Sequence, residues 1–123
     1  LGISGVSSDS RDIEEGIKAG DERCILAQKM YVKRIVDFIA KYYVELGGCD
    51  AIIFTAGVGE NSISTRMEVM EKLACLGVKP DIERNNVRGK ETLISADNSK
   101  IPVYIIPTNE ELMIATDTYN LAK

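Results

Sequence analysis

The sequence predicts an α/β domain, because apolar runs of strand length alternate with longer segments of helical periodicity. Residues 51–56 and 102–106 form two such apolar runs, and each is followed directly by a segment whose apolar residues recur every three or four positions. Strands that alternate with helices are typical of α/β architecture. The length of 123 residues allows one domain with one core.

The composition is that of an ordinary globular protein, with 45% hydrophobic and 28% charged residues. The net charge is -4 and lysine and arginine form no cluster, so neither a nucleic acid nor an anionic membrane is expected as a partner. The chain has no histidine. Any acid, base or metal-ligating role therefore falls to carboxylates.

Three widely spaced cysteines match neither a disulfide framework nor a zinc-binding spacing. We interpret them as small apolar packing residues in a protein of the reducing cytoplasm. No signal peptide is recognised, and no apolar run approaches the ~18 residues that a membrane-spanning helix requires.

The first forty-odd residues predict a loop and two helices. Residues 1–10 are rich in glycine and serine, and Ser8, Asp9 or Ser10 could cap a short helix that ends before Gly20. The cap does not explain Arg11, whose positive charge lies in the first helical turn, so a ligand opposite Arg11 is an alternative. A second, long helix is predicted over 21–46, with one broad apolar face directed to the core: Ile25, Leu26, Met30, Val32, Ile35, Val36, Ile39, Tyr43 and Leu46.

The segment 50–62 carries the strongest local pattern: a strand over 51–56, glycines at 57 and 59, and a helix from Ser62 to about Leu76. Such a turn suits a phosphate or a ribose, since glycine permits close backbone approach and the first N–H groups of the next helix lack partners. The pattern lacks the third glycine of the dinucleotide fingerprint and the Lys-Ser/Thr ending of a P-loop. The alternative is a tight strand-to-helix turn that uses glycine for its geometry alone. Asn61 or Ser62 is the expected helix cap, and Glu60 and Asn61 could instead reach a nucleotide.

The last third of the chain predicts a connector over 78–88, two strands at 92–95 and 102–106 that could pair as a hairpin, and a final helix to about Ala122. Thr108 and Glu111 have the spacing of a capping box. Glu110 is then left at the carboxyl end of a strand, where open α/β sheets bind ligands. It suits a hard cation, or it is a surface carboxylate that favours the helix dipole.

Four segments, 5–12, 50–61, 87–91 and 106–111, resemble the C-terminal part of the acetate kinase family and occur in the family's order. The resemblance covers essentially the whole chain. It implies the ribonuclease-H-like fold of the actin-like ATPase and sugar kinase superfamily. Residues 1–123 would then be part of the C-terminal, nucleotide-binding lobe, with the N-terminal domain absent.

The resemblance also implies ligand roles for particular residues. Asp9, Ser10 and Arg11 match the segment that contacts ribose and adenine, although Ser10 stands where the family often has an aromatic or aliphatic residue and should contribute little. Glu110 matches the magnesium-binding glutamate. The adenosine-side loop matches Gly57, Val58, Gly59, Glu60 and Asn61. The implied cofactors are ATP or ADP and Mg²⁺.

The implied reaction is reversible transfer of the γ-phosphoryl group of ATP to acetate, which gives acetyl phosphate and ADP. In the family, the acetate pocket and the catalytic residues belong to the missing N-terminal portion, so no catalytic residue is expected here and the chain should be inactive alone. The family is typically homodimeric. A propionate kinase fragment is an alternative, as is a stand-alone nucleotide-binding or regulatory module. An α/β interaction domain, in which the glycines serve geometry alone, is a third.

Overall fold

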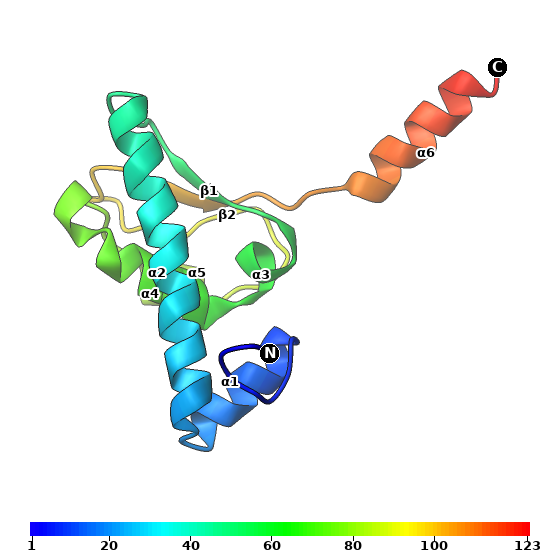
Figure 1. The fold of residues 1–123 in the computed structure, drawn as a ribbon. Helices are drawn as coiled ribbons and strands as arrows, with labels where there is room; N and C mark the ends of the chain where they lie inside the picture. Colours follow the sequence, from blue (N-terminus) through cyan, green and yellow to red (C-terminus); the bar gives the residue numbers. More distant parts are fainter.

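The computed structural model describes all 123 residues as a mixed α/β arrangement (Figure 1). The elements are α1 (Ser10–Lys18), α2 (Glu22–Glu45), β1 (Ile52–Phe54), α3 (Ala56–Asn61), α4 (Ile63–Lys72), a 3₁₀ turn (Ala74–Leu76), α5 (Ile82–Asn85), β2 (Thr92–Leu93), β3 (Val103–Ile105) and α6 (Glu110–Leu121). The α/β prediction is therefore confirmed.

The three strands form one sheet in the order β1-β3-β2. β1 runs parallel to β3, with Ile52 opposite Val103, and β2 pairs antiparallel with β3, which confirms the predicted hairpin. The ladder continues past the parallel strands, where the Ile106 N–H donates to the Phe54 carbonyl at 3.0 Å. Because β1 and β3 are parallel, the segments that follow them leave from the same edge of the sheet.

A core of ten buried hydrophobic residues lies between the sheet and helices α2 and α4: Val32, Phe54, Val69, Met70, Leu73, Val78, Ile94, Ile101, Val103 and Ile105. Cys24 is also buried and Cys49 packs against this core, as predicted, whereas Cys75 is exposed. No helix is both long and apolar enough to cross a membrane.

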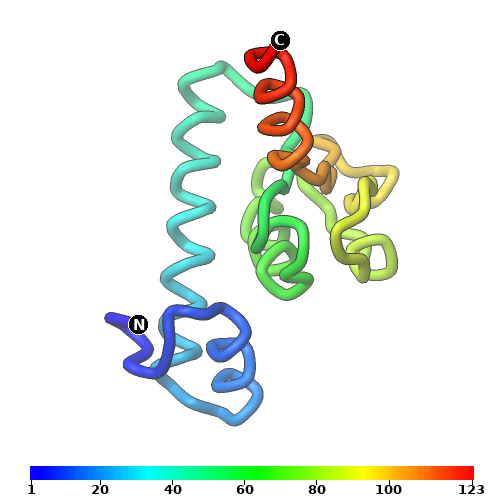
Figure 2. The backbone as a smooth tube through the Cα atoms, turned by 90° about the vertical axis from the view of Figure 1, so that its right-hand side faces the viewer, coloured from blue at the N-terminus to red at the C-terminus, as the bar shows by residue number.

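Helix α2 confirms the predicted long helix, but its apolar face is only partly buried. Asp21 caps it by accepting from the Cys24 N–H at 2.8 Å, and Gly47 and Gly48 follow its end with positive φ angles. Leu26, Met30 and Leu46 were predicted to lie in the core and are exposed. The physical reason is length: α2 reaches well beyond the small sheet toward α1, as Figures 1 and 2 show, at the end that carries Leu26 and Met30, and Leu46 caps its opposite end.

The turn after β1 differs from the prediction. The strand ends at Phe54, and the glycines lie inside helix α3 instead of an open turn that leads to Ser62. Ala56, the first residue of α3, has a φ of 58°, the only positive φ outside glycine. A left-handed alanine is strained by roughly 1 kcal/mol, so the surrounding contacts hold it in place.

Ser62 separates α3 from α4 and caps α4, with its side chain accepting from the Thr65 N–H. The helix then ends at Lys72, short of the predicted Leu76, and the 3₁₀ turn leads to Gly77 at φ 84°.

Helix α6 projects away from the sheet (Figure 1), and every residue of it is exposed. The predicted capping box is wrong. Asn109 is the cap, since its side chain accepts from the Leu112 N–H at 3.1 Å. Thr108 is instead engaged with Glu60, at 3.0 Å from the backbone N–H and 3.3 Å from the hydroxyl.

Candidate functional site

Two of the segments that were predicted to bind ligands, α3 after β1 and the segment around Glu110 after β3, meet at the carboxyl edge of the sheet. The Glu60 carboxylate, on α3, accepts from both the backbone N–H and the hydroxyl of Thr108, just after β3. This bridge links residues 48 positions apart in sequence. It places Glu110, two residues beyond Thr108, at the start of the helix that leaves this edge.

The two glycines of α3 face different surroundings. A Cβ added at Gly57 would meet nothing within 4 Å, so this position faces open space. A Cβ at Gly59 would lie 3.4 Å from the Phe54 carbonyl carbon, and thus Gly59 packs against the end of β1. Of the two, only Gly57 leaves room for a ligand against the backbone.

Glu60 and Asn61 both make bonds within the protein. The Asn61 side chain donates to the Gly57 carbonyl at 2.9 Å, inside α3. The Glu60 carbonyl accepts from the Gly89 N–H at 3.1 Å. These contacts brace α3 from within and against residues 85–89.

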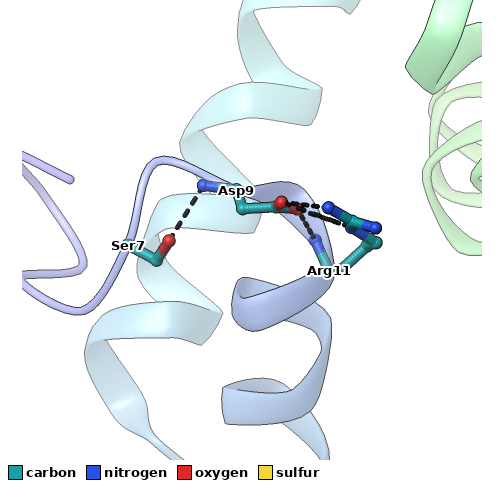
Figure 3. Close-up of polar contacts among 3 residues, drawn as sticks. All are labelled: Ser7, Asp9 and Arg11. Atoms are coloured by element: carbon teal, nitrogen blue, oxygen red, sulfur yellow. Dashed lines mark hydrogen bonds and ion pairs between the residues drawn. The ribbon is translucent and has the colours of Figure 1, made fainter.

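Asp9 and Arg11 form an exposed ion pair at the start of α1 (Figure 3). Asp9 caps α1 through the Arg11 N–H at 2.9 Å, and its other oxygen lies 2.6 Å from Nη2 of the same arginine. Ser7 holds the backbone that leads into α1, because its hydroxyl accepts from the Asp9 N–H at 3.0 Å. The position of Arg11 in the first turn, which the cap alone left unexplained, is thus accounted for by its pairing with the cap.

The hydrogen bonds from Arg11 lower the pKa of Asp9 to about 2. The same pairing raises the pKa of Arg11. Both groups are therefore charged at neutral pH. The Arg11 side chain keeps 85% of its surface exposed, so its guanidinium plane is accessible from solvent.

A cleft of about 460 Å³ is lined mainly by residues of the N-terminal segment, α1 and α2, with Val58 of α3 also on its wall. Its walls include Ser10 at the start of α1 and Val58 in α3, which are two of the predicted ligand residues. The two helical regions are tied by the Ser62 hydroxyl, which donates to the Glu14 carboxylate at 2.8 Å. The volume lies in the range of small-molecule sites.

Glu110 is exposed at the first position of α6. No group of three or more histidine, cysteine, aspartate or glutamate side chains is arranged to hold a metal ion. Any metal at Glu110 would thus rely on this carboxylate together with water or ligand oxygens.

The sequence analysis missed a buried arginine, Arg66, which is 0% exposed. Its side chain donates to the Gly59 carbonyl at 3.0 Å, which connects it directly to α3. A signal was present in the sequence, since Arg66 lies three residues after Ile63 and four before Met70, on the apolar face of the helix.

The sequence model of the Acetokinase family matches residues 1–116. The chain belongs to the acetokinase family. It is 57% identical over 118 residues to acetate kinase from Phocaeicola vulgatus, covering 96% of this chain and 30% of that protein. It is 54% identical over 123 residues to acetate kinase from Finegoldia magna, covering 100% of this chain and 31% of that enzyme.

Solved structures of an acetate kinase and a propionate kinase have the same fold over this chain. The crystal structure of Porphyromonas gingivalis acetate kinase matches with a TM-score of 0.89 and 47% identity, over 100% of this chain and 31% of that chain. A propionate kinase from Francisella tularensis matches with a TM-score of 0.84 and 38% identity, over 94% of this chain and 29% of that chain. The chain thus spans about 30% of the length of these relatives.

Proposed function

We propose that this chain is the nucleotide-binding side of an acetate kinase, which transfers the γ-phosphoryl group of ATP reversibly to acetate and gives acetyl phosphate and ADP. The observation that carries the proposal is the cleft shared by Ser10 and Val58 in a chain of the acetokinase family. Ser10 and Val58 come from the two segments for which the family resemblance implies contacts to adenosine, and their shared cleft supports the proposal.

The proposed nucleotide contacts follow from the chemistry of each position. The ionised Asp9 carboxylate accepts hydrogen bonds from ribose hydroxyls, and the exposed guanidinium plane of Arg11 stacks on the base. Gly57 allows the base or ribose to approach the α3 backbone, and Val58 supplies apolar contact. Ser10 and Gly59 contribute mainly through the backbone, and Glu60 and Asn61 hold α3 in shape.

Glu110 is the proposed magnesium ligand. Mg²⁺ favours oxygen ligands, keeps several waters, and is usually held by one or two carboxylates together with phosphate oxygens. A single exposed carboxylate at the first position of α6, on the edge of the sheet that α3 also leaves, fits that requirement. When bound, the ion neutralises charge on the phosphoryl group during transfer.

Residues 1–123 are proposed to form part of the C-terminal lobe, in the ribonuclease-H-like architecture of actin-like ATPases. The acetate pocket and the catalytic residues then lie in the portion of the enzyme outside this chain, so the chain alone should not transfer phosphate. We further propose that the complete enzyme is a cytoplasmic homodimer.

A second candidate is a propionate kinase, favoured by the likeness to the Francisella tularensis enzyme. The test uses the complete polypeptide that contains this chain, supplied with MgATP and either acetate or propionate, with ADP release and acyl phosphate measured. We expect a higher kcat/KM for acetate than for propionate. A preference for propionate would replace the substrate assignment. Nucleotide binding without transfer to either acid would support a regulatory module and overturn the kinase proposal.

A further inference from the structure

Arg66 is a buried cation whose neighbours are carbonyl groups. It is 0% exposed, and none of the ion pairs in the chain involves it. Burial, and secondarily the positive charge of Arg88, lower its pKa. A buried charge without a counter-ion is unfavourable unless hydrogen bonds compensate it. The hydrogen-bond partners of Arg66 therefore indicate which elements its charge stabilises.

The guanidinium lies at the carboxyl ends of two short helices. Nη1 donates to the Gly59 carbonyl near the end of α3, at 3.0 Å. Nη2 donates to the carbonyls of Asn85, the last residue of α5, at 2.9 Å, and of Val87, at 2.7 Å. Carbonyls at helix C-termini lack intrahelical partners and carry negative partial charge, which a cation satisfies.

Asn85 fixes the direction of the guanidinium. Its side chain is buried, accepts from Arg66 Nε at 2.8 Å and donates to the Ile63 carbonyl at 3.0 Å. Past Asn85 the chain returns to α3, where the Gly89 N–H donates to the Glu60 carbonyl. Arg66 is therefore the centre of a closed set of bonds that joins α3, α4 and residues 85–89.

We propose that Arg66 is a positioning residue that holds residues 57–61 in the geometry required for nucleotide binding, without touching the nucleotide itself. This inference rests on the proposed function. A six-residue helix that begins with a strained Ala56 is too short to be stable alone, so its orientation depends on such external bonds. The planar fork of arginine can reach carbonyls from two helices at once, which lysine cannot.

The test measures steady-state kinetics of the complete enzyme with Arg66→Ala and Arg66→Lys. We expect the KM for MgATP to rise about tenfold to one hundredfold in Arg66→Ala, as for the loss of one or two charge-assisted hydrogen bonds, with the KM for acetate unchanged. Arg66→Lys should show a smaller rise. Added methylguanidinium should lower the KM of Arg66→Ala toward the original value.

Arg84→Met is the matched control. Arg84 also donates to a backbone carbonyl, that of Ser95 at 3.1 Å, but it makes no hydrogen bond or ion pair with α3. The KM for MgATP of the Arg84→Met enzyme should equal that of the unsubstituted enzyme. A purely structural Arg66 would lower the melting temperature and the fraction of active enzyme while both KM values stayed the same, and that result would overturn the inference.

Two failures are distinguishable. In the first case the unsubstituted enzyme binds MgADP and phosphorylates acetate, and the Arg66 variants have the same KM for MgATP as that enzyme. Only the positioning role is then wrong. Where the unsubstituted enzyme binds no nucleotide, the proposed function itself is wrong. If Arg66→Ala does not fold, Arg66→Lys gives the same readout, and an unchanged KM for MgATP in that variant rejects the inference.

Discussion

The ion pair between Asp9 and Arg11 joins two side chains that are both proposed nucleotide contacts. The pKa of Asp9 is lowered to about 2, first by the side-chain hydrogen bond from Arg11 and then by the backbone bond. The pKa of Asp9 in the folded state lies below its ordinary value in the unfolded chain. The stability that the ionised Asp9 carboxylate contributes is therefore present above about pH 4 and is lost as the pH falls through 2.

Arg11→Gln should therefore raise the pKa of Asp9 toward its ordinary value. The return should be partial, since the backbone N–H of residue 11 still caps the helix. Carboxyl ¹³C chemical shifts followed through an acid titration measure this directly. An identical titration midpoint in both proteins would mean that Arg11 is unpaired in solution.

Gly57 and Gly59 offer a matched pair of substitutions. Alanine favours a helix over glycine by up to about 1 kcal/mol, and neither glycine has a positive φ. Gly57→Ala should keep or raise the melting temperature and weaken MgADP binding by adding a methyl group in the open space where the ligand is proposed to approach the α3 backbone. Gly59→Ala should also keep or raise the melting temperature, because its Cβ would lie at an ordinary van der Waals distance of 3.4 Å from the Phe54 carbonyl carbon.

The larger variant Gly59→Val should weaken both folding and nucleotide binding. Calorimetric affinities and melting curves of the variants separate the two effects. Equal MgADP affinity in Gly57→Ala and the unsubstituted protein would remove the case for a ligand at the α3 backbone.

Glu110→Ala in the complete enzyme should reduce turnover, and high magnesium should recover part of the loss, because the carboxylate contributes to ion affinity. Glu111→Ala is the control, since the neighbouring side chain is also exposed and makes no capping bond. Turnover as a function of Mg²⁺ concentration is the measurement. A loss that does not depend on magnesium would argue against a metal role for Glu110.

Helix α6 is the element least supported by the rest of the chain, since all of its residues are exposed. Removing residues 109–123 keeps the bridge between Thr108 and Glu60 and should shift the melting temperature by less than about 3 °C. Thermal unfolding followed by circular dichroism tests this. A much larger drop would show that α6 packs onto the body of this chain in solution.

The elements that could be predicted from the sequence are those with strong local signals. Helix α2 has a clear period and an aspartate cap, and the hairpin of β2 and β3 follows from two apolar runs around a polar turn. Helix α3 could not be predicted, because its turn is made by Ala56 and its glycines resemble a loop. The cap of α6 was misassigned because Thr108 is engaged by Glu60, a partner distant in sequence.

For the molecule as a whole, the sequence predicted the family and the presence in one fold of both segments for which ligand roles are proposed. It could not show which polar atoms are already occupied. Glu60 and Asn61 turn out to have internal partners, and Arg66 is buried by tertiary contacts on a helix whose apolar face otherwise predicts core packing. Such pairings depend on segments brought together only by folding.

The molecule buries only 17 of its 123 residues and leaves large apolar side chains exposed on α2, β1 and α6, including Phe38, Tyr42, Ile53 and Leu112. The family relatives are about three times as long as this chain, which makes up 30% of their length. We therefore propose that the residues lining the cleft, which include Ser10 and Val58, form one side of the nucleotide site, and that the rest of the longer enzyme forms the other side. Binding by this chain alone should be weak, since the contacts of the other wall are missing.

Calorimetric titration of the folded 123-residue chain with MgADP, repeated with EDTA, tests the central claim most directly. We predict weak but saturable binding with magnesium and a lower affinity in EDTA, where the contribution of Glu110 is removed. Circular dichroism of the same sample establishes that it is folded. The absence of any binding heat from that folded sample would contradict the claim that the adenosine half of the site is preformed on this chain.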